Sequence, residues 1–395
     1  MGLLEALDFH KDLQTGRLKD YVEVEYRLQS WGDILCPFIG DREHSTAARF
    51  VLTEFPFKLF SSSTPYGPLP QRLCLTFRAP HEERVHSKDF IRGGYFPLEI
   101  ANEFVAFLSL VSRRRTFVRG LTRTNGLPTD DEAEPRRGLP FQERQRMKEI
   151  HPGEIYRLLN NLQTMERRIA NGFVLGMRLY HSAIEMMYTD PEFSYLLLVT
   201  SLEAVSSVEY EKYVPKSAEE FFDSQFRGWR HLSNALPAEQ KPKLREVLLS
   251  GQEFTLGKLR EFLVENVPQR FWSEGEDDAK PDYLVGVIGR RGEEYSRSDI
   301  TIQQLERIDP EDLPRTVGEI YRARSKLIHE GIRLPSSIVI GLFRDIPADA
   351  LEEITKITMQ GTEIKKRLRI PPLLTFERLV SYSMVEFLSK HAGRV

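Results

Sequence analysis

The chain has 395 residues, of which 41% are hydrophobic and 29% are charged, and its formal net charge is −3. A net charge this small excludes nucleic-acid recognition by overall charge alone, so any such role must come from local patches. The two cysteines, Cys36 and Cys74, form no CxxC pattern, which argues against a disulfide framework and a structural zinc site.

No targeting or membrane segment is expected. The N-terminal residues show no basic region followed by an apolar run, which is the pattern of a signal peptide. The longest apolar runs, such as residues 195–199, are far too short to span a bilayer. We therefore expect a soluble, cytoplasmic protein that does not contact a membrane.

Residues 1–125 are expected to form a mixed α/β domain. Apolar and charged side chains alternate over residues 21–28, which is the period of a half-buried strand. Further strands are expected at 49–60 and 72–77. Residues 98–111 then place apolar side chains three and four positions apart, which predicts a helix.

A linker and a helical domain are expected to follow. Residues 126–150 are rich in Pro, Gly and acidic side chains and offer little to bury. Residues 151–395 are expected to be mainly helical. Pro152 can open one long helix that runs to a break at residues 189–191, where an N-cap is available for the next helix. That next helix, at about 193–208, is apolar nearly all round, which indicates a central position in the core.

A long insert, at about residues 209–312, separates this core helix from the next clear helix, at 316–330. Helical pieces are expected within the insert near 218–236 and 255–267. Gly331 supplies a stop for the helix that precedes it, and a closing helix is expected at 374–390. The predicted fold class is thus mainly α, with a C-terminal helical bundle preceded by a smaller α/β domain.

The helix at 316–330 contains the most informative motif. Its apolar side chains recur at helical spacing in one stripe, and Arg324 stands in the middle of that stripe. A guanidinium on a core-facing stripe keeps its charge and therefore needs an anionic partner. Glu203 is the best internal candidate, because it is the only charged residue of the core helix at 193–208.

His329 lies in the last turn of the same helix, about 140° around the axis from Arg324. Arg322, seven positions before His329, shares that side of the helix. Guanidiniums and an imidazole together suit a phosphate that gains charge in a transition state. The alternative is structural, because an arginine on a core face can serve as a plain ion pair and the Arg-x-x-x-x-His spacing also arises by chance.

Over roughly residues 150–390 the chain resembles the HEPN superfamily, and within it the Apea-like HEPN proteins. The segment YRARSKLIHEG is similar to that family's Arg-polar-x-x-x-His helix, with Ser325 as the polar residue. The preceding stretch, RLYHSAIEMMYTDPEFSYLLLVTSLEAV, is similar to its first two core helices. The insert of about 100 residues departs from the family's pattern.

The resemblance implies a metal-independent endoribonuclease in which the substrate's own 2′-hydroxyl attacks the adjacent phosphate. His329 would act as general base or acid near neutral pH. Arg324 would stabilise the charged phosphorane, and Glu203 would orient Arg324. The resemblance also implies a homodimer, in which two such helices face each other and build one composite site. Neither a cofactor nor a metal is implied.

Four further side chains are expected to contact RNA. Arg322, Ser325 and Lys326 lie on the motif helix, and Arg114 belongs to a run of arginines at 113–115. Basic side chains of this kind can follow an RNA backbone, because phosphate contacts dominate such affinity. They can equally be ordinary solvated surface.

Rival functions stay open at this point. A toxin-like or antiviral role, such as cutting RNA during phage infection, would suit the family. The main rival is a catalytically inactive HEPN scaffold that binds RNA, a nucleotide or a partner protein. Another is a subunit that needs an activator or a larger complex, recruited through the N-terminal domain. A catalytic site requires His329 to be exposed beside Arg324 and to face a groove or the second copy of the chain. A His329 that is buried or turned away from Arg324 would favour the scaffold.

Overall fold

A computed structural model describes residues 2–30, 49–52, 56–61, 71–80, 96–113, 115–125, 127–128, 152–187, 189–213, 231, 234–237, 239–244, 254–273, 306–307, 310–334, 350–357, 363–368, 370–371 and 373–391. Most of the expected linker at 126–150 and of the expected helical piece at 218–236 lies outside these residues. The proposed domain boundaries therefore stay a prediction.

The N-terminal strands form one antiparallel sheet. Its order is β2 (Arg49–Leu52), β3 (Phe57–Ser61), β4 (Gln71–Ala79), β1 (Val22–Ser30), β5 (Thr116–Thr124) and β6 (Leu127–Pro128). The alternation in β1 has the expected effect, because Val24, Tyr26 and Leu28 are buried while Arg27 is exposed. The stretch at 49–60, expected as one strand, forms the paired strands β2 and β3 instead.

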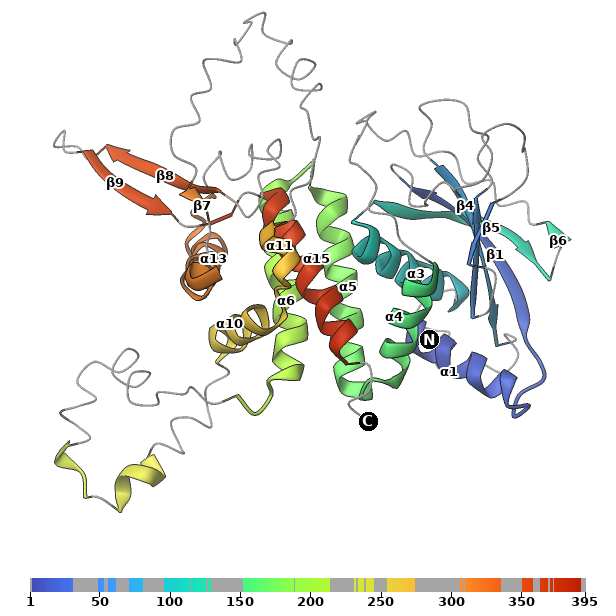
Figure 1. Cartoon of the computed structure of the whole chain (residues 1–395), viewed down its shortest axis with the longest axis horizontal. Helices are drawn as coiled ribbons and strands as arrows, with labels where there is room; N and C mark the ends of the chain where they lie inside the picture. The colour runs from blue at the N-terminus through green and yellow to red at the C-terminus, as the bar shows by residue number, and fades with distance from the viewer. Residues whose placement is uncertain are drawn as a thin grey trace, which may run out of the picture.

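Two helices, α1 (Leu3–Gln14) and α3 (Phe96–Ser112), pack against the sheet. The ring of Phe104 in α3 stacks on that of Phe57 in β3, with centroids 4.4 Å apart. On its other side α3 faces the helical part of the chain, where Ser381 donates a hydrogen bond to the carbonyl of Leu110. Figure 1 shows α3 between the sheet and the central helices, which explains why it is apolar on nearly all sides.

The helical part consists of α4 (Pro152–Thr164), α5 (Arg167–Met186), α6 (Pro191–Glu209), α10 (Thr255–Asn266), α11 (Gln269–Ser273), the short 3-10 helix η2 (Pro310–Asp312), α13 (Leu313–Glu330) and α15 (Leu373–Lys390). The single helix expected from Pro152 to the break at 189–191 is wrong. It is interrupted at Glu166, whose extended backbone (φ −51°, ψ 131°) ends the helical run. This break allows α4 to pack on α1 and α15 while α5 pairs with α6.

Helix α6 is the central helix of this part, as its composition indicates, and it packs against α5, α10, α13 and α15. Its first turn is capped by Asp190, whose carboxylate accepts the backbone N–H of Phe193. Close contact with α5 depends on two glycines. A Cβ at Gly176 would lie 2.8 Å from the Ser201 carbonyl oxygen, and a Cβ at Gly172 would meet the Val208 side chain.

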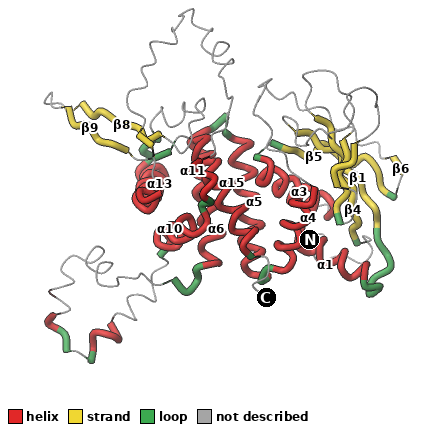
Figure 2. Tube along the Cα trace, in the orientation of Figure 1, coloured by secondary structure: helices red, strands yellow, loops and turns green. Residues whose placement is uncertain are grey.

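A second sheet has three strands. It contains β7 (Glu306–Arg307), β8 (Ala350–Ile357) and β9 (Glu363–Leu368), and the sequence had not indicated it. Helix α13 ends at Gly331, whose φ of 65° is the left-handed conformation expected of a glycine stop. Figure 2 shows that the described part of the chain is mainly helical, with strands at its two sides. No helix among the described residues has both the length and the apolar character needed to cross a membrane.

Candidate functional site

Helix α13 passes from a buried to an exposed environment along its length. Val317 and Ile320, near its start, are fully buried against the core. Leu327 packs only partly against that core, and Ile328 is 47% exposed. The apolar stripe expected along the whole helix is therefore fully buried in its first half and only partly covered in its second half, where Arg324 and His329 stand.

Arg324 is paired with Glu203. One terminal nitrogen of the guanidinium lies 3.2 Å from a carboxylate oxygen of Glu203. The side chains are 22% and 12% exposed, so the contact is mostly sheltered from water. Helix α6 holds Glu203 and helix α13 holds Arg324, so the ion pair also joins the central helix to the motif helix. The pairing predicted from the sequence is the one that the structure contains.

The pair retains unused hydrogen-bonding capacity. Within the described part of the chain, Nε of Arg324 and Oε1 of Glu203 have no hydrogen-bond partner, although both atoms are buried. Burial raises the pKa of the Glu203 carboxyl, while the neighbouring Arg324 acts in the opposite direction. The guanidinium also lies 5.8 Å from the centre of the Tyr321 ring. Arg324 is thus held from one side and has donors left for a further acceptor.

His329 is exposed in the last turn of α13. Among the described residues it makes no hydrogen bond or ion pair. Helical geometry separates it from Arg324 by about 140° around the axis. One copy of α13 therefore presents the two side chains on different sides of the helix, with Arg324 toward α6 and His329 toward solvent.

The three other residues of α13 that are expected to contact RNA differ in their exposure to solvent. Arg322 is 64% exposed and its guanidinium lies 3.0 Å from a carboxylate oxygen of Glu319, which is one helical turn away. Lys326 is exposed, and Ser325 is half-buried. Arg322 and Lys326 therefore share the solvent side with His329, whereas Arg324 does not.

Two of the three arginines at 113–115, Arg113 and Arg115, have acceptors within the protein. Arg114, the residue expected to bind RNA, lies outside the described residues. Arg113 is nearly buried and donates to both carboxylate oxygens of Glu377. Arg115 donates to the carbonyl of Glu185. The two neighbours of Arg114 thus serve packing between α3, β5 and the helices, because each guanidinium has an acceptor inside the molecule.

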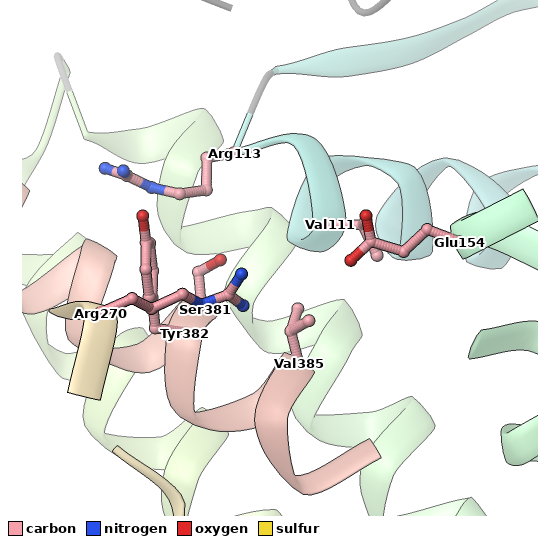
Figure 3. A pocket seen from close by; sticks show the side chains of 7 residues that line it. All are labelled: Val111, Arg113, Glu154, Arg270, Ser381, Tyr382 and Val385. Carbon is pink, nitrogen blue, oxygen red and sulfur yellow. The ribbon is translucent and has the colours of Figure 1, made fainter. Parts of the chain in front are cut away.

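A cavity borders the Arg113 site, between α3, α11 and α15, and Figure 3 shows Arg113, Arg270 and Tyr382 around it. Its volume is about 10 Å³, room for no more than one water. Nearby, the Tyr180 hydroxyl donates to Glu377, and burial raises the pKa of Tyr180 well above its ordinary value. The cavity is too small for a nucleotide, so this polar cluster has a structural role in joining the helices.

Two exposed arginines on or beside the first half of α13 were not predicted as site residues from the sequence. Arg315 stands in the first turn of α13, on the same face as Arg322. Its spacing of seven residues from Arg322 was a usable signal. Arg260 comes from α10 in the insert, and its Nε donates to the carbonyl of Pro314 at 3.1 Å. Only the tertiary packing of α10 on α13 brings Arg260 to this surface.

Comparisons with known family models, with curated proteins and with solved structures find no match to this chain. Among the described residues, no group of three His, Cys, Asp or Glu side chains is arranged to hold a metal ion.

Proposed function

We propose that the chain is a metal-independent endoribonuclease of the HEPN type, with Arg324 and His329 at its active site and a toxin-like or antiviral role. The observation that carries the proposal is the Arg324–Glu203 ion pair, on a helix whose last turn exposes His329. A partly buried guanidinium with a fixed anionic partner and a donor to spare, on the same helix as an exposed imidazole, suits a reacting phosphodiester when two copies of that helix face each other. The HEPN resemblance of the motif residues supports the same function.

The reaction needs no group beyond substrate and side chains. The 2′-oxygen forms a bond to phosphorus, and the bond from phosphorus to the 5′-oxygen breaks. A base takes the 2′-hydroxyl proton, and an acid supplies a proton to the leaving 5′-oxygen. The products are a 2′,3′-cyclic phosphate and a 5′-hydroxyl. His329 performs one of these proton transfers, and Arg324 donates to the phosphoryl oxygens as their charge grows.

Glu203 acts in this proposal as a positioning residue. Its carboxylate fixes one side of the Arg324 guanidinium, which leaves fewer orientations for the donors that face the substrate. It does not contact the substrate itself. Loss of Glu203 is therefore expected to weaken cleavage less than loss of Arg324.

A homodimer is part of the proposal, because Arg324 and His329 of one chain lie on different sides of α13. A second copy brings its own His329 to the composite site. Three exposed apolar side chains support a protein contact at this end of the helix: Phe193, Ile328 and Ile332 are 43%, 47% and 50% exposed. The backbone N–H of Leu334 donates to Glu192, so the segments that hold Ile332 and Phe193 contact each other.

The proposal is tested by incubating labelled RNA with wild-type protein and with His329→Ala, in the presence of EDTA. Wild-type protein is expected to cut the RNA, and His329→Ala is expected to lose at least about 100-fold in rate, the usual contribution of a proton-transfer group. Arg157→Ala serves as control, because Arg157 is an exposed side chain on α4. Cleavage that His329→Ala retains would refute the assignment.

A catalytically inactive scaffold that binds RNA, a nucleotide or a partner protein is the second candidate. The wide angle between Arg324 and His329 around α13 favours it, because a single chain does not bring the two groups together. If neither the wild type nor the variant cuts RNA, while the wild type still binds it, the scaffold replaces the nuclease.

A further inference from the structure

One face of α13 carries a row of basic side chains. Arg315, Arg322, Lys326 and His329 are all exposed. At 100° per residue they fall within an arc of about 60°, and they extend over about 21 Å of helix axis. Arg324 points away from this row, on the opposite side of the helix. The row ends at His329, so it leads directly to a group of the proposed active site.

Helix α10 adds a further guanidinium, that of Arg260, beside this row. A terminal nitrogen of Arg260 lies 3.5 Å from the point that a Cβ of Gly318 would occupy, and a terminal nitrogen of Arg322 lies 3.9 Å from the same point. The hydrogen bond from Arg260 Nε to the Pro314 carbonyl fixes the arginine on this side of α10. Two guanidiniums thus lie close together over the surface of α13.

The acidic side chains that α13 itself contributes, Glu319 and Glu330, lie along one edge of the row. Glu319 is 18% exposed and paired with Arg322, and Glu330 is exposed in the last turn. At 100° per residue, both glutamates lie about 40–60° around the helix axis from Arg315. Gly318 lies on the opposite edge of the row. Among the described residues of α13, the edge of the row beside Gly318 and α10 therefore carries no acidic side chain, and Arg322 is the member of the row that has a carboxylate partner. A polyanion is the ligand with complementary charge.

We infer that Arg260, Arg315, Arg322 and Lys326 form a track that binds the backbone of single-stranded RNA and leads it to His329. The inference rests on the proposed ribonuclease function. It names the path of the substrate and assigns part of that path to the insert, through Arg260. A single file of cations matches one phosphate backbone, whereas an A-form duplex is contacted across its minor groove on two strands.

The track is tested by binding of a fluorescent 2′-O-methyl oligonucleotide of about ten nucleotides, which cannot undergo 2′-hydroxyl attack. Its Kd is measured over a salt series for the wild type and for Arg260→Gln. One lost phosphate contact is expected to reduce the slope of log K against log salt by about 0.7. The same slope makes binding about fivefold weaker near 0.1 M salt, and the difference vanishes toward 1 M.

Two control variants separate charge from structure. Arg260→Lys keeps the charge but loses the planar guanidinium whose Nε donates to Pro314, and it is expected to bind with nearly the wild-type slope. Arg157→Gln removes an exposed arginine from α4 and is expected to leave Kd unchanged. An Arg260→Gln variant with wild-type affinity and slope would overturn the track. So would an equal loss in Arg157→Gln, or tighter binding of a 2′-O-methyl duplex.

Cleavage of unmodified RNA, measured in parallel, separates the track from the proposed function. If Arg260→Gln binds as the wild type while His329→Ala alone loses cleavage, the track is wrong and the nuclease stands. If Arg260→Gln loses binding but no protein cuts RNA, the track stands as the surface of a scaffold.

Discussion

Glu203 and Arg324 stabilise each other in a mostly buried environment, which disfavours either charge without its partner. The Glu203 carboxylate is 12% exposed, and its raised pKa reports the cost of removing it from water. The guanidinium offsets part of that cost at 3.2 Å. Each side chain therefore depends on the other, which is the behaviour of a structural ion pair and also of a positioned catalytic arginine.

A double-mutant cycle measures this dependence. Glu203→Ala or Arg324→Ala alone is expected to lower the free energy of unfolding by about 1–3 kcal/mol, because each leaves a mostly buried charged group without its partner. The double variant is expected to lose less than the sum of the two, with a coupling energy of about 0.5–3 kcal/mol. Urea titration gives all four values, and strictly additive losses would show that the contact contributes nothing.

His181 gives the fold a pH dependence. Burial lowers the pKa of this imidazole, and its Nε2 lies 2.8 Å from the carbonyl oxygen of Thr116. The folded chain keeps His181 neutral while the unfolded chain takes up a proton near pH 6.5, its ordinary value. Stability from this group is therefore present above about pH 6.5 and is lost as pH falls toward the lower folded pKa.

The expected result is a free energy of unfolding that falls between about pH 7 and pH 5. His181→Gln keeps a donor for Thr116 but cannot titrate, so its unfolding free energy is expected to fall less over the same interval. Part of the slope stays in this variant, because burial also lowers the pKa of His10. An identical slope in the variant and the wild type would contradict this role.

At the scale of elements, the pairing of α5 with α6 depends on glycine. Gly176 allows the two backbones to approach until Ser201 donates its hydroxyl to the Gly176 carbonyl at 2.6 Å. Any Cβ at this position would press against the Ser201 carbonyl oxygen and the Val205 side chain. The two helices that carry Tyr180 and Glu203 are therefore held at a distance that no larger residue allows.

Gly176→Ala is expected to lower the free energy of unfolding by about 1–3 kcal/mol through overpacking. Gly153→Ala is the matched control, because a Cβ there meets nothing within 4 Å in the first turn of α4. This control is expected to be neutral or to stabilise the fold by up to about 1 kcal/mol, since alanine favours helix. Thermal denaturation of both variants compares them, and equal effects would argue against the close contact.

Elements with a strong hydrophobic period and an evident boundary residue are predictable from the sequence of this chain. Helices α6 and α13 have marked stop or cap residues, Asp190 and Gly331, and their apolar faces follow the helical repeat. The break at Glu166 has no Pro or Gly to signal it, so tertiary packing overrides a good helical pattern there. Strand β5 was hidden because two register shifts against β1 interrupt its alternation.

Some features of the candidate site were likewise predictable from the sequence, and others were not. The Arg324–Glu203 pair was predictable because both residues are isolated charges on otherwise apolar helix faces. The burial of Arg113 was not, because its partner Glu377 lies on α15, far along the chain. The same holds for Arg260, whose place beside α13 follows from the packing of an insert helix that carries no motif.

At the scale of the whole molecule, α3 joins the sheet to the helices in one continuous hydrophobic core. The same helix contacts β5 on one side and α5 and α15 on the other. The N-terminal part is therefore built against the helices.

The end of α13 is expected to mediate dimerisation. Ile328→Asp places a charge among the exposed apolar side chains there and is expected to convert a dimer of twice 45.8 kDa into a monomer. Val264→Asp is the matched control, because Val264 is 50% exposed on α10. Light scattering after size exclusion gives both masses. A wild-type monomer, or a dimer that survives Ile328→Asp, would remove this interface from the account.

The central claim, RNA cleavage by attack of the substrate's 2′-hydroxyl, is tested most directly by changing that hydroxyl. The wild-type protein is incubated in EDTA with two substrates. One is an RNA whose cleavage position has been mapped, and the other is the same RNA with a 2′-O-methyl group at that position alone. Cleavage at that position is expected to disappear, and the unmodified RNA is expected to yield 2′,3′-cyclic phosphate ends. Continued cutting at the blocked position, or products with 5′-phosphate ends, would contradict the account.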